Sequence, residues 1–248
     1  MNDRAEPKLS AVPWTIGDIV RSILLVVLGV LALNVPLLII LVAQALLDGS
    51  SAVAQALRSP LVLGATVIAG EVVFFLAAWI FSVRKYGGDW RLLGYRVFPA
   101  RRGLSLALLV VVFCLGVNVI YGLIINALGR QDLIPQQPVL EQLGRGPLGV
   151  LLLFLAAAVA APLAEETFFR GFLFPGLARR LGGILAAIIS AAAFAAAHFE
   201  IGALAPIFVL GLALTWLYHE TRSLWPCILV HASYNTLAII ATLTAQQG

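Results

Sequence analysis

The sequence predicts an all-α fold, a polytopic transmembrane helical bundle of about seven spans. Of its 248 residues, 61% are hydrophobic and only 11% are charged, and the mean hydropathy is +1.01. In soluble domains about a quarter of the residues are charged. The apolar residues also gather in uninterrupted runs, most of which approach or exceed the roughly 20 residues that cross a bilayer. The chain carries no basic patch interleaved with aromatic residues, so we expect a lipid bilayer around it and no nucleic-acid partner.

Three spans are expected in the first half of the chain. Residues 1–21 are polar and mixed in charge, and they predict a cytoplasmic N-terminal tail. The apolar runs that follow extend from Ser22 to about Leu47, from Leu61 to about Val83 and from Leu104 to about Leu128. The first run is too long for the core of a signal peptide, which favours a retained helix. We therefore assign residues 22–147 to N-terminal transmembrane helices.

The second half begins with an apolar run that is too long for one straight crossing. It extends from Leu148 to Leu181, and about 34 helical residues would reach roughly 50 Å. This helix must tilt, kink near Pro162 or project from the membrane before Gly182 and Gly183 end it. The remaining spans are expected at Ile184–Phe199, Ala203–Tyr218 and Leu224–Leu243, and we treat residues 148–244 as one core region.

The basic residues of the polar segments predict the orientation. With seven spans, 12 arginines and lysines fall on one side and 3 on the other, with Arg170 left out as intramembrane. Cytoplasmic loops collect positive charge, so the N-terminus is expected in the cytoplasm and the C-terminus outside. The smaller group consists of Arg58, Arg130 and Arg145. These features predict an integral membrane protein of a bacterial-type plasma membrane.

The most informative motif places three ionisable side chains inside the longest apolar run. A charged residue near the middle of a bilayer helix costs roughly 2.5 to 3.5 kcal/mol on insertion scales, so such residues need partners or a function. Glu166 and Arg170 are four residues apart and can pair on one helix face. Glu165 is turned about 100° away from Glu166 around the helix, which leaves it available for chemistry.

Two further polar clusters lie in apolar segments. His198 ends the segment Phe194–His198, and His231 precedes Asn235 by four residues, so these two side chains face the same way. Glu165 lies 17 residues before Gly182, and His198 lies 15 residues after Gly183. In an antiparallel hairpin both would sit roughly 23 to 26 Å from the turn, so Glu165 and His198 are expected to meet.

These three motifs resemble those of the CAAX-processing and bacteriocin-processing membrane proteases, also called the Abi family. The resemblance rests on Glu165–Arg170 for E-E-x-x-x-R, Phe194–His198 for F-x-x-x-H and His231–Asn235 for H-x-x-x-N or D, and it covers about residues 148 to 240. It implies an intramembrane endopeptidase that cleaves membrane-associated proteins or peptides. By the same resemblance Glu165 and His198 activate water, His231 and Asn235 stabilise the oxyanion, and Glu166 and Arg170 support the site.

Peptide hydrolysis needs an activated water, a proton for the leaving amine and donors for the oxyanion, and two arrangements satisfy this. In the favoured one, Glu165 is the general base and no cofactor is required. In the other, Glu165, His198 and His231 bind zinc and Glu166 is the base. The zinc version lacks the compact H-E-x-x-H pattern and would have to break the pair of Glu166 with Arg170.

Two other classes of membrane protein could carry the same polar residues without being proteases. A single membrane histidine is more often a packing residue than a catalytic one, and a scaffold or bacteriocin self-immunity protein could keep the same fold without catalysis. A transporter could use Glu71, Glu165 and Glu166 as a proton relay, but the two related halves typical of transporters are not visible. If Glu71 is not part of such a relay, we expect its carboxylate to be hydrogen-bonded in the interior of the bundle. The sequence does not name the substrate.

Overall fold

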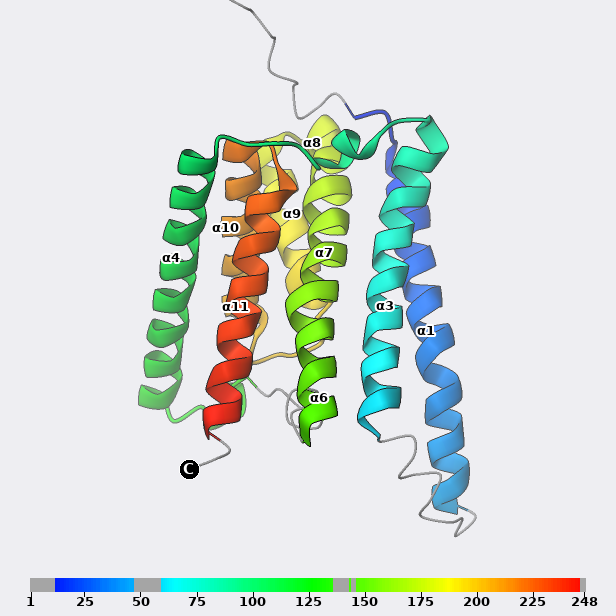
Figure 1. Ribbon diagram of the computed structural model, residues 1–248, viewed down its shortest axis with the longest axis vertical. Helices are drawn as coiled ribbons and strands as arrows, with labels where there is room; N and C mark the ends of the chain where they lie inside the picture. Colours follow the sequence, from blue (N-terminus) through cyan, green and yellow to red (C-terminus); the bar gives the residue numbers. More distant parts are fainter. Residues whose placement is uncertain (1–11, 47–58, 136–142, 144–145, 246–248) are drawn as a thin grey trace, which may run out of the picture. The chain divides into compact units, whose positions relative to one another are not determined.

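The computed structural model describes residues 12–46, 59–135, 143 and 146–245 (Figure 1), and every regular element in them is a helix. The α-helices in the first half of the sequence are α1 (Ile16–Leu46), α3 (Pro60–Trp79) and α4 (Ala100–Ala127). The later ones are α6 (Gly146–Leu153), α7 (Ala161–Glu166), α8 (Phe174–Leu181), α9 (Gly183–Ala196), α10 (Leu204–Thr221) and α11 (Leu224–Ala245). Short π- or 3₁₀-helical stretches are η1 (Ile80–Arg84), η2 (Trp90–Leu93), η3 (Gln131–Leu133), η4 (Phe154–Ala160) and η5 (Thr167–Leu173).

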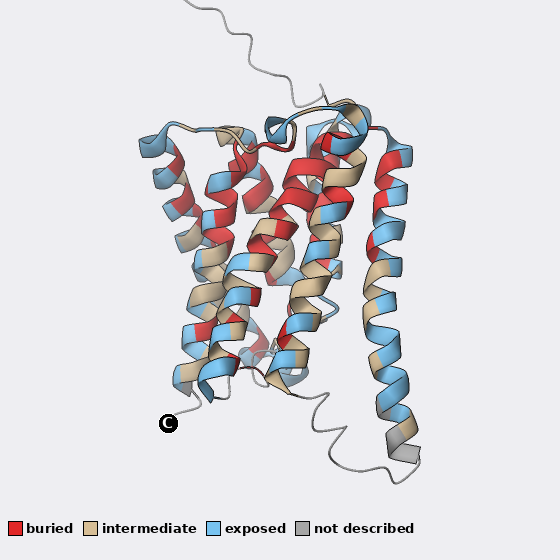
Figure 2. Cartoon of the chain, turned by 45° about the vertical axis from the view of Figure 1, so that its right-hand side comes forward, coloured by how far each residue is buried: buried red, intermediate tan, exposed pale blue. Residues whose placement is uncertain are grey.

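The predicted polytopic helical bundle is confirmed. Within the described residues, six helical segments are long and apolar enough to cross a membrane, and the shorter apolar helix α9 is the seventh. Each of the seven coincides with one of the predicted spans to within a few residues. The surface agrees with this, because α1 and α4 expose many large apolar side chains. Figure 2 shows exposed residues along much of the length of the helices. Exposed apolar area of this extent suits lipid rather than water.

The first helix begins earlier than predicted. The sequence placed its start at Ser22 because of the polar residues before it, whereas α1 begins at Ile16. Thr15 and Asp18 cap the first turn reciprocally, since the Thr15 N–H donates to Asp18 and the Asp18 N–H donates to the Thr15 hydroxyl. Lys85 and Tyr86 also donate to the Asp18 carboxylate. The buried charge of Asp18 is thus compensated by residues distant in sequence.

The overlong apolar run is one continuous helical segment from Gly146 to Leu181. It contains two π-helical stretches, η4 and η5, on either side of α7. Pro162 lies just after η4, where its missing N–H and its ring disturb the α-helical hydrogen-bond ladder. At the far end Gly182 adopts φ 78°, a left-handed conformation that favours glycine and that ends α8 as predicted.

The chain forms two compact units. The first comprises Met1–Val20, Ala78–Gln136 and Glu166–Val230, and within it α9 packs against α8 and α10 while α10 packs against α4. The contact of α9 with α10 is close, because a Cβ added at Gly211 would lie 3.0 Å from the Ala191 Cβ. Small residues allow this approach.

The second unit comprises Arg21–Ala77, Gln137–Glu165 and His231–Gly248. In it α1 lies beside α3, and Gly29 provides the space, since a Cβ there would lie 2.7 Å from Val73 (Figure 1). A buried cluster of Leu143, Leu153 and Ile239 joins α6 to α11. The boundary between the units falls between Glu165 and Glu166, so the two adjacent acids of the motif belong to different units.

Candidate active site

In the first unit, Glu166 and Arg170 form the pair that their spacing predicts. Arg170 Nη1 donates to Glu166 Oε1 at 2.7 Å, and both side chains are fully buried. Their placement at i and i+4 on successive helical turns allows this contact. This contact confirms the predicted ion pair. Each charge compensates the other in a buried environment where an unpaired charge would be costly.

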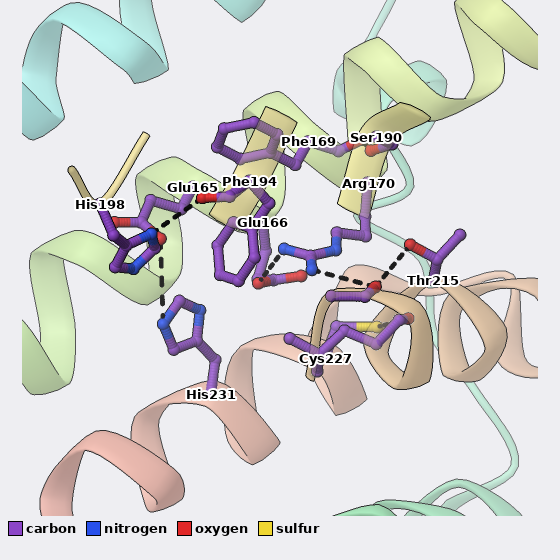
Figure 3. A network of polar contacts seen from close by, with 12 residues as sticks. Glu165, Glu166, Phe169, Arg170, Ser190, Phe194, His198, Thr215, Cys227 and His231 are labelled. Atoms are coloured by element: carbon purple, nitrogen blue, oxygen red, sulfur yellow. Dashed lines mark hydrogen bonds and ion pairs between the residues drawn. The ribbon is translucent and has the colours of Figure 1, made fainter. Parts of the chain in front are cut away.

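Arg170 also connects three helical segments of this unit (Figure 3). Its Nη2 donates to the carbonyl of Gly211 on α10 at 3.2 Å, and its guanidinium lies 4.2 Å from the ring centre of Phe194 on α9. Thr215 donates to the same Gly211 carbonyl at 2.8 Å. A cation above an aromatic ring is stabilised electrostatically, more strongly when both are desolvated. Arg170 is therefore the centre of a buried polar network.

His198 lies beyond the end of α9, in the turn that follows it, and not inside a helix as its apolar surroundings suggested. Its Nδ1 contacts the Phe194 carbonyl at 2.8 Å. A carbonyl can only accept, so Nδ1 carries the hydrogen and, in a neutral imidazole, Nε2 is the basic nitrogen. The ring packs edge-on against Phe194 and the side chain is largely exposed. This geometry presents an imidazole nitrogen able to accept a proton.

Three contacts hold the residues that follow the acid pair. The Tyr95 and Thr167 hydroxyls are 2.6 Å apart, and Ser190 on α9 donates to the Phe169 carbonyl at 3.1 Å. The carbonyl of Phe172 accepts a hydrogen bond from the indole of Trp14 at 3.0 Å. These contacts fasten η5 to neighbouring segments of the first unit.

In the second unit, Glu165 lies opposite His231. Glu165 Oε2 is 3.9 Å from His231 Nε2, and the side chains are 14% and 3% exposed, respectively (Figure 3). This distance is too long for a direct hydrogen bond but allows an ion pair when His231 is protonated. Within the described residues, Glu165 Oε2 is buried and has no hydrogen-bond partner. The contact places a carboxylate and an imidazole from α7 and α11 side by side.

Glu71 of α3 belongs to the same unit and interacts electrostatically with Glu165. The sequence suggested that it is hydrogen-bonded in the interior. In the described part of the chain, however, its Oε2 atom is buried without a hydrogen-bond partner. The second unit thus holds two carboxyl groups, Glu71 and Glu165, each with a buried oxygen that has no hydrogen-bond partner within the described residues.

Asn235 is engaged by the backbone of η4. Its Nδ2 donates to the Ala157 carbonyl at 2.7 Å. The Ala161 N–H, which would bond Ala157 in an α-helix, donates instead to Ala156, and Pro162 at the next position has no N–H. The π-helical turn and the proline together thus leave the Ala157 carbonyl without a helical donor, and Asn235 supplies one. This contact fixes η4 against α11, just before Glu165.

The zinc alternative requires Glu165, His198 and His231 around one metal ion. Within the described residues, no group of three or more His, Cys, Asp or Glu side chains is placed to hold a metal ion. Glu165 and His231 approach each other in the second unit, and in the described part of the chain no third such side chain joins them in a metal-binding group. The zinc alternative stays a prediction, and we derive no step through a metal.

The structure thus places the predicted site residues in two groups. Glu166, Arg170 and His198 belong to the first unit, and Glu165, His231 and Asn235 belong to the second. The pairing of Glu165 with His198 stays a prediction. The zinc alternative expected Glu165 near His231, but spacing alone did not establish this contact. Sequence reasoning missed the roles of Trp14 and Tyr95. Trp14 had one visible signal, an aromatic residue at the junction of a polar tail and an apolar run.

Comparison with known proteins finds a match over the part of the chain that carries the three motifs. Residues 147–237, which contain all three motifs, match the family model described as type II CAAX prenyl endopeptidase Rce1-like. Over these residues the chain is similar to the CAAX protease-like membrane proteins. The match begins at α6 and ends in α11, so it includes both groups of site residues and leaves α1, α3 and α4 outside.

Two curated relatives match over part of their length. The chain is 28% identical over 94 residues to the protein named "Putative membrane peptidase YdiL" from Bacillus subtilis, which covers 38% of each protein. It is 29% identical over 108 residues to "UPF0177 protein YxdF" from Lactococcus lactis, covering 43% of this chain and 53% of that protein. The chain thus matches about half or less of the length of these relatives. No solved structure matches it.

Proposed function

We propose that this CAAX protease-like protein is an intramembrane endopeptidase that hydrolyses peptide bonds of membrane-associated proteins. The observation that carries the proposal is the contact of Glu165 with His231 at 3.9 Å, inside apolar helices. A carboxylate and an imidazole that are held together with little exposure to water can exchange protons with a substrate and with a bound water. The peptidase name of one relative supports the same reaction class.

In the proposed reaction, Glu165 takes a proton from a water molecule as its oxygen attacks the scissile carbonyl. The carboxyl group then returns this proton to the leaving amine. His198 assists the activation of water through Nε2, the nitrogen that its bond to Phe194 leaves basic. His231 stabilises the oxyanion as a hydrogen-bond donor. Asn235 is proposed to help there, and its bond to Ala157 also positions the helix that carries Glu165.

Glu166 and Arg170 have a supporting role in this proposal. Their ion pair is fully buried, and Arg170 is further held by Gly211 and Phe194. The Arg170 guanidinium occupies the Glu166 carboxylate, so this group is not placed to act on a substrate. We therefore assign proton transfer to Glu165 and the maintenance of local geometry to the pair.

The proposal is tested with purified protein in lipid nanodiscs and a membrane-associated peptide library, with cleavage followed by mass spectrometry. Glu165→Gln and His231→Ala should each lower the cleavage rate by at least about 100-fold, the usual contribution of a general acid or base. Asp132→Asn is the matched control, because it also removes one carboxylate but from an exposed ion pair with Arg130. The control should cleave at the wild-type rate.

The outcomes separate the enzyme from its main alternative. A scaffold or self-immunity protein would show no cleavage above the level of Glu165→Gln, and its activity in cells would survive that substitution. If wild type cleaves and Glu165→Gln cleaves equally well, the assignment of Glu165 is wrong. Metal analysis of the same samples tests the zinc alternative, since zinc that co-purifies with wild type and is lost in Glu165→Gln would contradict the metal-free mechanism.

A further inference from the structure

An apolar groove runs between α4 and α10, two helices that pack against each other in the first unit. Its walls include Leu109 and Phe113 of α4 and Val209, Ala213 and Trp216 of α10, and every residue that lines it is apolar or aromatic. Its volume is about 430 Å³, within the roughly 300 to 1,000 Å³ of sites that hold a small ligand. The groove therefore has room for an apolar group of ligand size.

The groove faces the bilayer and is short. Leu109, Phe113 and Trp216 are exposed, and both helices belong to candidate membrane spans, so hydrocarbon surrounds them. From Val209 to Trp216 the groove follows about 10 Å of α10. That is less than half of the roughly 30 Å of a bilayer core. A helix of a second protein copy would pack along the whole span, whereas one lipid acyl chain lies within a single leaflet. The length therefore suits an acyl chain.

An ion pair lies beyond one end of the groove. Arg102 Nη2 donates to Glu220 Oε2 at 2.7 Å, and the two side chains are 63% and 30% exposed, respectively. Glu220 is four residues after Trp216, so the two share one face of α10. Arg102 is two helical turns before Leu109 on α4. These separations are about 6 and 10 Å along the helix axes, so the pair lies close to the ends of both candidate spans.

The pair offers both charges to one ligand. A guanidinium has five N–H donors and a carboxylate accepts several hydrogen bonds, so their mutual contact does not exhaust either group. His219 Nδ1 lies 3.7 Å from Glu220 Oε1, beyond hydrogen-bond distance. Arginine suits a phosphate group, and a carboxylate suits an ammonium group. Because the charges of Arg102 and Glu220 cancel, a zwitterionic headgroup complements them better than an anionic one.

We propose that α4 and α10 bind one molecule of phosphatidylethanolamine, with an acyl chain in the groove and the headgroup on the ion pair of Arg102 with Glu220. Arg102 donates to the phosphate, and Glu220 accepts from the primary ammonium. The half-exposed indole of Trp216 lies between them and the groove, at the level where tryptophan meets the membrane interface. The site does not rest on the proposed peptidase activity, because none of its residues belongs to the candidate active site.

The test measures lipid binding to the full-length protein by native mass spectrometry in detergent. Its lipids are dioleoyl phosphatidylethanolamine, the N,N-dimethyl form and dioleoyl phosphatidylcholine, whose nitrogens carry three, one and no N–H donors. Wild type should bind the first at least about fivefold more tightly than the last, the effect of one charge-assisted hydrogen bond at an exposed site, with the dimethyl form between them. Equal affinities would overturn the proposal. Tighter binding of dioleoyl phosphatidylglycerol than of phosphatidylethanolamine would also overturn it, since it would indicate attraction to anionic lipid only.

Glu220→Gln tests the ammonium contact. It should reduce the preference for phosphatidylethanolamine to within about twofold, and it should fold, because an exposed ion pair contributes little to stability. Asp132→Asn is the matched control, since it removes one carboxylate from an exposed ion pair beyond the other end of α4. It should keep the wild-type preference. An unchanged preference in Glu220→Gln, or an equal loss in both variants, would contradict the site.

Ala213→Phe tests the groove, because the larger side chain would fill it. This variant should bind phosphatidylethanolamine and phosphatidylcholine each at least about fivefold more weakly, while the ratio of the two affinities is kept. A short-chain lipid gives the same test on wild type. Dihexanoyl phosphatidylethanolamine should bind at least about fivefold more weakly than the dioleoyl form, since fewer methylene groups enter the groove. Equal binding of both chain lengths would mean that the groove holds no acyl chain.

Discussion

Arg170→Ala is expected to destabilise the protein strongly, because the substitution leaves a buried carboxylate without its counter-ion. Arg170 and Glu166 are both fully buried and are joined at 2.7 Å. Removing one partner of such a pair typically costs about 3 to 5 kcal/mol. The variant also loses the contact of Arg170 with the Phe194 ring, at 4.2 Å, and its bond to the Gly211 carbonyl. We therefore expect the upper end of this range.

The assay is thermal unfolding in detergent, where a loss of this size should lower the melting temperature by roughly 10 °C or more for a chain of this length. A double-mutant cycle identifies the cause. Glu166→Gln with Arg170→Met replaces both charges by groups of similar shape, and it should recover at least half of the loss. If Arg170→Ala melts within about 2 °C of wild type, or if the double variant is no better than Arg170→Ala, the uncompensated charge is not what destabilises the protein.

Three further predictions concern other parts of the chain. Glu165→Gln should keep the wild-type melting temperature within about 2 °C, because its buried oxygen has no hydrogen bond to lose within the described residues; a loss like that of Arg170→Ala would contradict this. Trp14→Ala should lower the free energy of unfolding by roughly 3 to 5 kcal/mol, measured with urea or heat, since the indole is fully buried and stacks on Phe172 at 5.3 Å. A loss below about 1 kcal/mol would mean that the N-terminal segment is not anchored there. A cysteine introduced at Val97, which is 99% exposed, should react with an impermeant thiol reagent only from the cytoplasm, and a cysteine introduced at Asp132 only from outside. The two native cysteines are buried and should add little background. The reverse labelling pattern would refute the predicted orientation. The predicted position of the C-terminus at residue 248 lies outside the described residues.

Local spacing was enough to predict several features. The apolar runs predicted the helices because a bilayer requires backbone hydrogen bonds within each segment, and the structure has a helix at every predicted span. The pair of Glu166 with Arg170 followed from the four-residue periodicity of a helix, and it is present at 2.7 Å. Gly182 was expected to end a helix and does so with φ 78°.

Contacts between distant segments could not be predicted in this way. Asp18 was read as part of a polar tail, because nothing in the sequence shows that Lys85 and Tyr86 neutralise it. The contact of Glu165 with His231 depends on how α7 and α11 rotate about their axes. Spacing alone gives the height of a side chain along its helix but not the face that it presents to a neighbour.

The sequence by itself determined the membrane class, the helices, the family motifs and the ion pair of Glu166 with Arg170, since each of these depends on residues a few positions apart. Tertiary structure decided the partners of those motifs. Asn235 shows the reason most directly. Whether its amide serves an oxyanion or a backbone carbonyl depends on the π-helical turn before Pro162, which removes a helical donor from Ala157 on another helix. Water does not hydrogen-bond a carbonyl in an apolar interior, so this carbonyl needs a donor from the protein. Only the packing of distant helices brings the Asn235 amide to it.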